Sequence, residues 1–237
     1  MFGYADAVID RFPTIRAGVI HATNLVNGPS SPALLEAYRA EQRNVSERLS
    51  ASAIAELPSV STLVDIGNLV SIRYAMPVAV FDLADIAGSI TVRFAAGAEL
   101  FTDLGAADSV HPEPGEATFV DNNDVVSARR WCWRQSARSA TRPSTVDALF
   151  VIEGHHDSAE QEIALALGAS LCRCPSEPAN PDSAGLDGVV VLVEPARRGP
   201  GQSGQGVDHR PVLPYRMPGR QGGPRLVGGQ QPVGQRQ

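Results

Sequence analysis

The feature that most limits what this chain can fold into is a break in its composition near residue 171. Residues 171–237 hold 12 of the 22 Gly and 10 of the 18 Pro. Together these make up about a third of the segment, a share typical of low-complexity sequence. Residues 1–170 keep the periodic apolar patterns that a core requires. We therefore expect one folded domain over residues 1–170 and a disordered Gly, Pro, Arg and Gln tail over residues 171–237.

The tail permits a second interpretation. All 20 basic residues are Arg, as codon bias in a GC-rich genome produces, and out-of-frame reading of such a gene yields unpatterned Arg, Gly, Pro and Gln. The tail is thus either a disordered segment or a frameshift product. One apolar run within it, GVVVLVEP at 188–195, has the composition of a strand.

Charge divides at the same boundary, with 12 Arg against 21 acidic residues in 1–170 and 8 Arg against 5 in the tail. No apolar run approaches the roughly 18 residues that a transmembrane helix needs, and acidic residues stand where a signal peptide has a basic start. We expect a cytoplasmic protein with no membrane partner. The three cysteines match neither a zinc pattern nor a disulfide framework, so we expect no metal and no cofactor.

The apolar patterns of residues 1–170 predict an α+β domain, with a mixed or antiparallel sheet flanked by helices. Helices are expected at 32–49, 52–57 and 63–76, and from Asp157 or Ser158 onward, with Ser31 as the N-cap of the first and Pro32 at its first position. Strands are expected at 15–23, 78–83, 89–95, 98–104, 117–121, 124–131 and 147–154. The D-N-N-D sequence at 121–124 predicts a hairpin.

The standard catalytic motifs are absent. The sequence contains no G-x-S-x-G elbow, no phosphate-binding loop, no H-E-x-x-H and no G-x-G-x-x-G after a strand. Acyl-enzyme chemistry on a serine or cysteine is therefore disfavoured, although a triad assembled from distant residues stays open.

The densest polar cluster, SARRWCWRQSARSATRPS at 127–144, gathers five arginines around two tryptophans in an otherwise acidic domain. Guanidinium groups beside aromatic rings hold phosphates and stack bases, as single-stranded RNA requires. On a strand, however, alternate residues face opposite ways. Trp131 and Trp133 are then core, and Arg130 and Arg134 form a solvated face. The cluster is either a nucleic-acid contact or ordinary packing.

Two further polar groups stand out. Glu153 precedes His155 and His156 at the end of an expected strand, where a carboxylate beside imidazoles can serve as a base, a ligand or an anchor. Adjacent strand residues point apart, which disfavours a metal site that uses both histidines. Asp65 and Asn68 lie at i and i+3 of an expected helix, a spacing usual for backbone anchors.

A run of motifs follows in fixed order from V-D-I-G-N at 64–68. It continues with Pro77, F-D-L at 81–83, Gly88, V-R at 92–93, G-A-E at 97–99 and Gly105, and more weakly through LFVIEG at 149–154. This order resembles the B3/B4 domain of the phenylalanyl-tRNA synthetase beta subunit. The amino-terminal portion and the WRQS stretch look more like stand-alone bacterial proteins built on that domain. The resemblance implies a single B3/B4-like domain.

The resemblance also implies a function. In the synthetase this domain is an editing module that binds the 3' end of mischarged tRNA and hydrolyses the wrong aminoacyl ester, typically that of tyrosine. By this likeness Asn68 falls on an editing-pocket asparagine, and Gly67 falls on a neighbouring pocket threonine. Glu153 falls on the glutamate that contacts the misacylated side chain. Asn68 and Glu153 are the expected catalytic residues.

Two departures from the family pattern bear on specificity. Ala79 replaces the histidine that stands just before F-D-L, and residues 130–135 replace a glycine-rich pocket wall. The expected substrate-binding residues are Gly67, Ala79, Arg130, Trp133, Arg134 and Gln135. The departures leave three alternatives: an aminoacyl-tRNA deacylase acting in trans, a non-catalytic domain that binds tRNA or an amino-acid-like ligand, and a degenerate product without activity.

Overall fold

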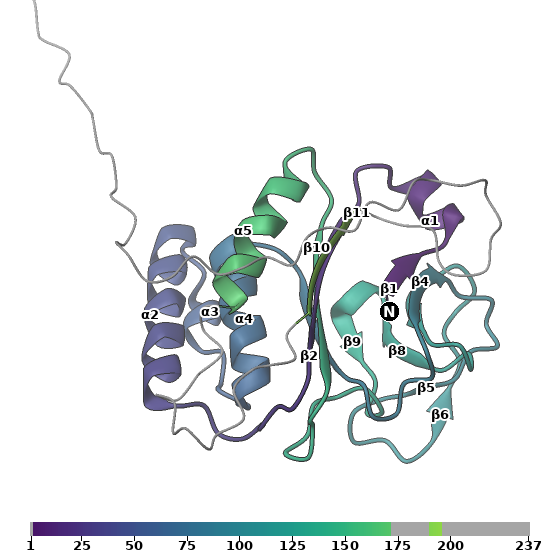
Figure 1. Cartoon of the computed structure of the whole chain (residues 1–237), viewed down its shortest axis with the longest axis horizontal. Coiled ribbons are helices and arrows are strands. Elements are labelled where there is room, and N and C mark those ends of the chain that lie inside the picture. The colour runs from purple at the N-terminus through teal and green to yellow at the C-terminus, as the bar shows by residue number, and fades with distance from the viewer. Residues whose placement is uncertain (1, 172–189, 196–237) are drawn as a thin grey trace, which may run out of the picture.

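The computed structural model describes residues 2–171 and 190–195, which form three layers (Figure 1). The helical layer consists of α2 (Pro32–Leu49), α3 (Ser52–Ala55), α4 (Thr62–Tyr74) and α5 (Ala159–Leu171). It covers one face of a four-stranded sheet, and a second, five-stranded sheet lies against the other face. The expected α+β class, with helices flanking a mixed sheet, is confirmed.

The four-stranded sheet has the order β11-β2-β10-β3 and is antiparallel throughout. Its strands are β2 (Arg16–Ala22), β3 (Val78–Asp82), β10 (Ala148–Gly154) and β11 (Val190–Pro195). The apolar run at 188–195 thus supplies a strand, which pairs with β2. The other residues of the expected tail, 172–189 and 196–237, lie outside the described residues. Strand β3 forms one edge of this sheet.

The five-stranded sheet has the order β1-β4-β7-β8-β9, and β1 and β4 are parallel while the other pairs are antiparallel. Its strands are β1 (Phe2–Tyr4), β4 (Ile90–Phe94), β7 (Ala117–Val120), β8 (Val126–Arg129) and β9 (Arg134–Gln135). The remaining elements are helix α1 (Asp6–Arg11), a two-stranded ribbon of β5 (Phe101–Thr102) and β6 (Ser109–Val110), and the 3₁₀ turn η1 (Trp131–Trp133).

Two cores result from this layering. Because side chains alternate along a strand, Phe150 and Ile152 of β10 pack toward the helices, whereas Leu149 and Val151 pack toward the second sheet. Strand β10 is therefore buried along its whole length. The same alternation places the side chain of Glu153 on the face between the two sheets.

Local sequence signals explain the confirmed elements. The Ser31 hydroxyl caps α2 by accepting a hydrogen bond from the Leu34 amide, and Pro32 occupies the first turn. Helix α4 ends at Tyr74, and the left-handed backbone of the next residue, Ala75, turns the chain before Pro77. The predicted hairpin joins β7 to β8, and the Asp121 carboxylate orders its turn by accepting the amides of Asn123 and Val125.

Two predicted strands are shorter than expected. The strand at 98–104 reduces to Phe101–Thr102, because the Glu99 carboxylate accepts the amides of residues 96–98 and bends the chain there. The strand at 124–131 ends at Arg129, since Arg130 and Trp131 adopt φ of 51° and 56°. The placement of both tryptophans in the core is therefore wrong for Trp133, whose side chain is 80% exposed.

Two elements near the amino terminus were not predicted. Strand β1 has three residues and helix α1 has six, too short for either apolar period to show in the sequence. No helix within the described part of the chain is long and apolar enough to cross a membrane.

Candidate functional site

A cavity of about 100 Å³ lies between α4 and the edge strand β3. Its wall is formed by Val64, Gly67, Asn68, Val78, Ala79, Val80, Phe81, Ala128, Cys132 and Gln135. Four of the residues predicted from the sequence therefore come together here, namely Gly67, Asn68, Ala79 and Gln135. They come from three parts of the chain, which only the fold brings to one place.

Close packing of α4 on β3 shapes this cavity. A Cβ atom added at Gly67 would lie 2.9 Å from the Val80 side chain, so glycine allows the helix to approach the strand. Asp65 fixes the start of the same helix, as its spacing indicated. Its buried carboxylate accepts hydrogen bonds from the hydroxyls of Ser30 and Ser59, both at 2.6 Å, and from the Val60 amide at 2.9 Å.

Gln135 closes the open side of β3. Its amide nitrogen donates to the Val80 carbonyl at 2.7 Å and to the Ser139 carbonyl at 3.0 Å. An edge strand presents unpaired backbone groups, and Gln135 satisfies one of them while it also lines the cavity. The Asn68 side chain also lies beside the buried hydroxyl of Tyr38, a residue of α2 that does not line this cavity, although the pair does not reach full hydrogen-bond geometry.

Glu153 lies behind this cavity and not on its wall. The carboxylate is 1% exposed. Its Oε1 atom accepts a hydrogen bond from the Tyr4 hydroxyl at 2.5 Å, and its Oε2 atom accepts one from the Cys132 thiol at 3.4 Å. Cys132 also lines the cavity, so its side chain contacts both Glu153 and the space that a ligand would fill.

Burial dominates the electrostatics of this group. It raises the pKa of Glu153 to about 7, although the hydrogen bonds from Tyr4 and Cys132 favour the ionised form. Burial and the neighbouring carboxylate raise the pKa of the Cys132 thiol well above its usual value. The thiol is therefore protonated near neutral pH, which makes it a poor nucleophile.

The sequence matches a known domain family. The B3/4 domain family matches residues 36–170, more than half of the chain. The chain belongs to the B3/4 domain family. Among curated proteins no match is found. One similar solved structure is an N-terminal fragment of the phenylalanyl-tRNA synthetase beta-subunit from Pyrococcus horikoshii, with 11% identity and a TM-score of 0.47. The alignment covers 73% of this chain and 47% of that one, so the B3/4 protein spans about half the length of that chain.

The family match begins at residue 36, so β1, α1 and β2 of this B3/4 protein lie outside it. Tyr4 belongs to that outer segment. Ala79 pairs with Val151 in the β3–β10 register, which places Ala79 and Glu153 on the same face of the sheet. Alanine at position 79 has no side-chain donor to offer Glu153. The hydrogen-bond donors to Glu153 are instead Tyr4 and Cys132.

Arg130 and Arg134, two of the remaining predicted residues, line a separate cavity of about 200 Å³, whose wall is formed by Asp103, Arg129, Arg130 and Arg134. Arg129 is held by two 2.6 Å hydrogen bonds to Glu116, which keep the pKa of that carboxyl low, and Arg134 forms an ion pair with Asp103. Arg130 is freer, since its side chain is 59% exposed and its contact to Glu116 is 3.9 Å.

Residues 130–135 of the B3/4 domain connect the two cavities. Arg130 and Arg134 line one cavity, and Cys132 and Gln135 line the other. Trp133, within the same segment, is exposed to solvent. Trp131 turns inward instead, and its ring lies 4.9 Å from that of His155 and 5.4 Å from that of Phe12. His155 thus packs against aromatic rings.

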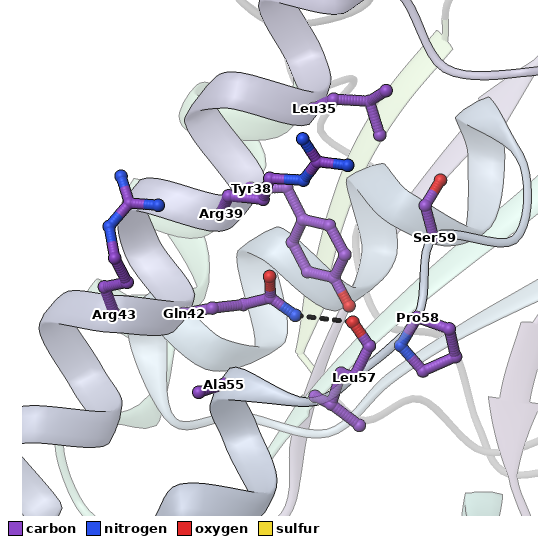
Figure 2. Close-up of a pocket in the computed structure, with 9 residues that line it drawn as sticks. All are labelled: Leu35, Tyr38, Arg39, Gln42, Arg43, Ala55, Leu57, Pro58 and Ser59. Atoms are coloured by element: carbon purple, nitrogen blue, oxygen red, sulfur yellow. Dashed lines mark hydrogen bonds between the residues drawn. The ribbon is translucent and has the colours of Figure 1, made fainter.

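A third cavity, of about 340 Å³, lies between α2 and the segment after α3 (Figure 2). Gln42 joins the two sides of this cavity by donating a hydrogen bond to the Leu57 carbonyl at 2.7 Å. Arg39 and Arg43 lie at the edge of the cavity. None of the residues predicted from the sequence lines this cavity, and its polar groups come mostly from one face of a single helix.

Sequence reasoning missed Tyr4 and gave Cys132 no role. Tyr4 lies in a three-residue strand outside the family match, and no motif surrounds it. Cys132 is a single cysteine within the segment that departs from the family pattern. The only sequence signal is the position of Glu153 near the end of a continuous apolar strand. A carboxylate buried there needs hydrogen-bond donors from other parts of the chain.

Proposed function

We propose that this B3/4 domain binds the aminoacyl 3' end of tRNA and hydrolyses the ester of a mischarged amino acid in trans. The observation that carries the proposal is the cavity between α4 and β3, which gathers Gly67, Asn68, Ala79 and Gln135 in a chain that belongs to the B3/4 domain family. Such a cavity suits one small organic group, held by apolar walls and a few polar atoms.

The chemistry fits a site without an enzymic nucleophile. An aminoacyl ester is already activated, so a positioned water and a donor to the developing oxyanion suffice. The Asn68 amide lies on the cavity wall and is the proposed donor to the ester carbonyl. No cofactor is required, because water is the attacking species and the tRNA hydroxyl leaves with a proton.

The second cavity would hold the nucleic acid. Arg130 and Arg134 are the proposed contacts to terminal phosphates, and the exposed ring of Trp133 is the proposed stacking surface for a base. The acidic balance of residues 1–170 does not oppose this role, since the arginines are concentrated in one segment. The chain segment 130–135 would then link recognition of the nucleotide to recognition of the amino acid.

One observation favours the alternative of binding without hydrolysis. Glu153 is 1% exposed, does not line the cavity and accepts hydrogen bonds from Tyr4 and Cys132, so this buried carboxylate is held away from a water in the cavity. A domain that only binds would retain tRNA in a salt-dependent way and leave the ester intact.

The test is a deacylation panel. Purified protein is incubated with tRNAs that carry correct and incorrect amino acids, and ester loss is followed against buffer. We expect faster loss for at least one mischarged tRNA, reduced by about 10- to 100-fold in Asn68→Ala. Asn44→Ala, which changes an exposed asparagine on α2, is the matched control and should keep the rate. Retention of tRNA without ester loss on any pair would select the binding alternative.

A further inference from the structure

We propose that the cavity between α4 and β3 accepts only small aliphatic aminoacyl groups, of alanine to valine size, and that Tyr4 and Cys132 set this limit. The inference rests on the proposed function, because it names the class of amino acid that the aminoacyl site would take. Neither residue is part of the motif run from which the site was first predicted.

The first argument is volume. The cavity measures about 100 Å³. A benzene ring is held by an apolar protein cavity of about 150 Å³, so a phenyl or phenol side chain would not lie fully inside this half-open cavity. Much of the wall is aliphatic. It includes Val64 of α4 and Val78 and Val80 of the edge strand β3.

The second argument is the occupied carboxylate. A larger polar side chain entering this site would need a partner for its hydroxyl or amine, and the buried carboxylate of Glu153 lies behind Cys132 on the cavity wall. Its Oε1 atom already accepts from Tyr4 and its Oε2 atom from Cys132. A substrate hydroxyl left unpaired in an apolar space loses its hydration without compensation, which lowers its affinity.

The third argument is that these donors are fixed in place. Tyr4 pairs with Val92 in the β1–β4 register, and its ring packs edge-on against Phe2 with centroids 5.3 Å apart. Its side chain is fully buried. Cys132 belongs to η1, which the left-handed Arg130 holds at the end of β8. The chain therefore presents its own phenol to Glu153, and Cys132 closes the cavity in front of it.

The experiment keeps the nucleic acid constant and varies only the amino acid. One tRNA is charged in turn with alanine, valine, phenylalanine and tyrosine, and each deacylation rate is corrected for loss in buffer. We expect alanyl and valyl esters to react at least about tenfold faster than the two aromatic esters. An aromatic ester that reacts as fast as the alanyl ester would overturn the inference while leaving the proposed function intact.

If no ester reacts, hydrolysis fails and the size limit is still tested by binding. Amide analogues of aminoacyl-adenosine, which cannot be hydrolysed, are titrated by calorimetry with the same four amino acids. Tighter binding of the alanyl and valyl analogues supports the limit. Equal or tighter binding of the aromatic analogues, or no binding of any analogue, overturns it.

A pair of variants tests the two residues directly. Cys132→Ala opens the wall in front of Glu153, and Tyr4→Phe frees the Oε1 atom while keeping an aromatic ring in the core. The double variant should raise the rate for the tyrosyl ester relative to the phenylalanyl ester by about tenfold, because a phenol can then reach the carboxylate. Tyr4→Phe alone keeps the wall and should show no such gain. A folded double variant without the gain would remove Tyr4 and Cys132 from the account.

Discussion

The Tyr4 hydroxyl donates a 2.5 Å hydrogen bond to the Glu153 carboxylate, and the two residues stand 149 positions apart in the chain. The bond joins β1 of one sheet to β10 of the other across the core between them. It also orients a buried carboxylate that lies behind the wall of the adjacent cavity. In the proposed function, this one contact bears on both the stability of the domain and the selectivity of its site.

Tyr4→Phe should lower the free energy of unfolding by about 1–3 kcal/mol, because it leaves a buried carboxylate oxygen without its donor. Tyr38→Phe is the matched control. The Tyr38 hydroxyl is buried and makes no hydrogen bond of full geometry among the described residues, so its removal should cost less than that of the Tyr4 hydroxyl. Denaturant unfolding measures both variants. Equal destabilisation by the two substitutions would contradict the assignment.

The stability of the protein should depend on pH through Glu153. Burial raises its pKa from 4.5 to about 7, so between these values the unfolded chain releases a proton that the folded protein retains. Stability contributed by the protonated carboxyl is thus present at low pH and lost as pH rises through this window. Tyr4 and Cys132, which contact the carboxylate, stay neutral throughout, since both have raised pKa values.

Glu153→Gln removes this titration and provides the comparison. The unfolding free energy of the unmodified protein, relative to the variant, should fall by about 3 kcal/mol from about pH 4.5 to about pH 8. Denaturant unfolding of both proteins at a series of pH values measures the difference. A difference that stays level, or that rises with pH, would show that Glu153 is ionised in the folded protein.

The elements with strong local signals could be predicted from the sequence. Helix α2 carries its cap at Ser31 and its proline at position 32, and β10 is a continuous apolar run. What failed depends on local backbone conformations that residue propensities do not indicate. The strand at 98–104 is broken by the Glu99 carboxylate, and β8 stops at a left-handed Arg130, which no local propensity predicts for arginine.

The candidate site shows the same division. The V-D-I-G-N motif located Gly67 and Asn68, which do lie together on one cavity wall. The sequence also identified Glu153. Its position behind the cavity wall could not be predicted, because that position depends on contacts with Cys132 and with Tyr4, which is 149 positions away. Three residues of β1 carry too little pattern to predict a pairing, and tertiary contacts alone create it.

Gly67→Ala should test the cavity at a modest cost in stability. Alanine favours the helix by about 1 kcal/mol over glycine, but its Cβ would lie 2.9 Å from the stiff side chain of Val80, which must shift. Overpacking of this kind costs about 1–3 kcal/mol, so we expect the unfolding free energy to fall by up to about 2 kcal/mol. The added methyl group occupies ligand space and should weaken binding of the valyl analogue more than that of the alanyl analogue. Equal loss for both would place the amino acid elsewhere.

Arg130→Ala should weaken tRNA binding and its dependence on salt. Arg130 is the least engaged arginine on its cavity wall, and loss of one phosphate contact lowers the slope of log K against log salt by about 0.7. Arg48→Ala carries the same charge change in the last turn of α2 and is the control. Filter binding over a range of salt concentrations measures the slopes. Identical slopes for the two variants would mean that net charge alone governs binding.

Trp133→Ala should reduce affinity for single-stranded 3' ends by about 1–3 kcal/mol if the exposed ring stacks on a base. The protein fold should be unaffected, since the side chain is 80% exposed. Fluorescence anisotropy with a short single strand that ends in the tRNA 3' sequence measures the affinity. Unchanged affinity would exclude Trp133 from the contact surface.

The central claim is that the cavity between α4 and β3 receives the aminoacyl group. A crystal structure with the non-hydrolysable alanyl-adenosine analogue tests it most directly. The account predicts the alanyl methyl group against Val80 and the carbonyl oxygen within hydrogen-bond distance of the Asn68 amide, with Tyr4 still bonded to Glu153. An analogue bound in the cavity between α2 and the segment after α3, or a carbonyl held away from Asn68, would contradict it.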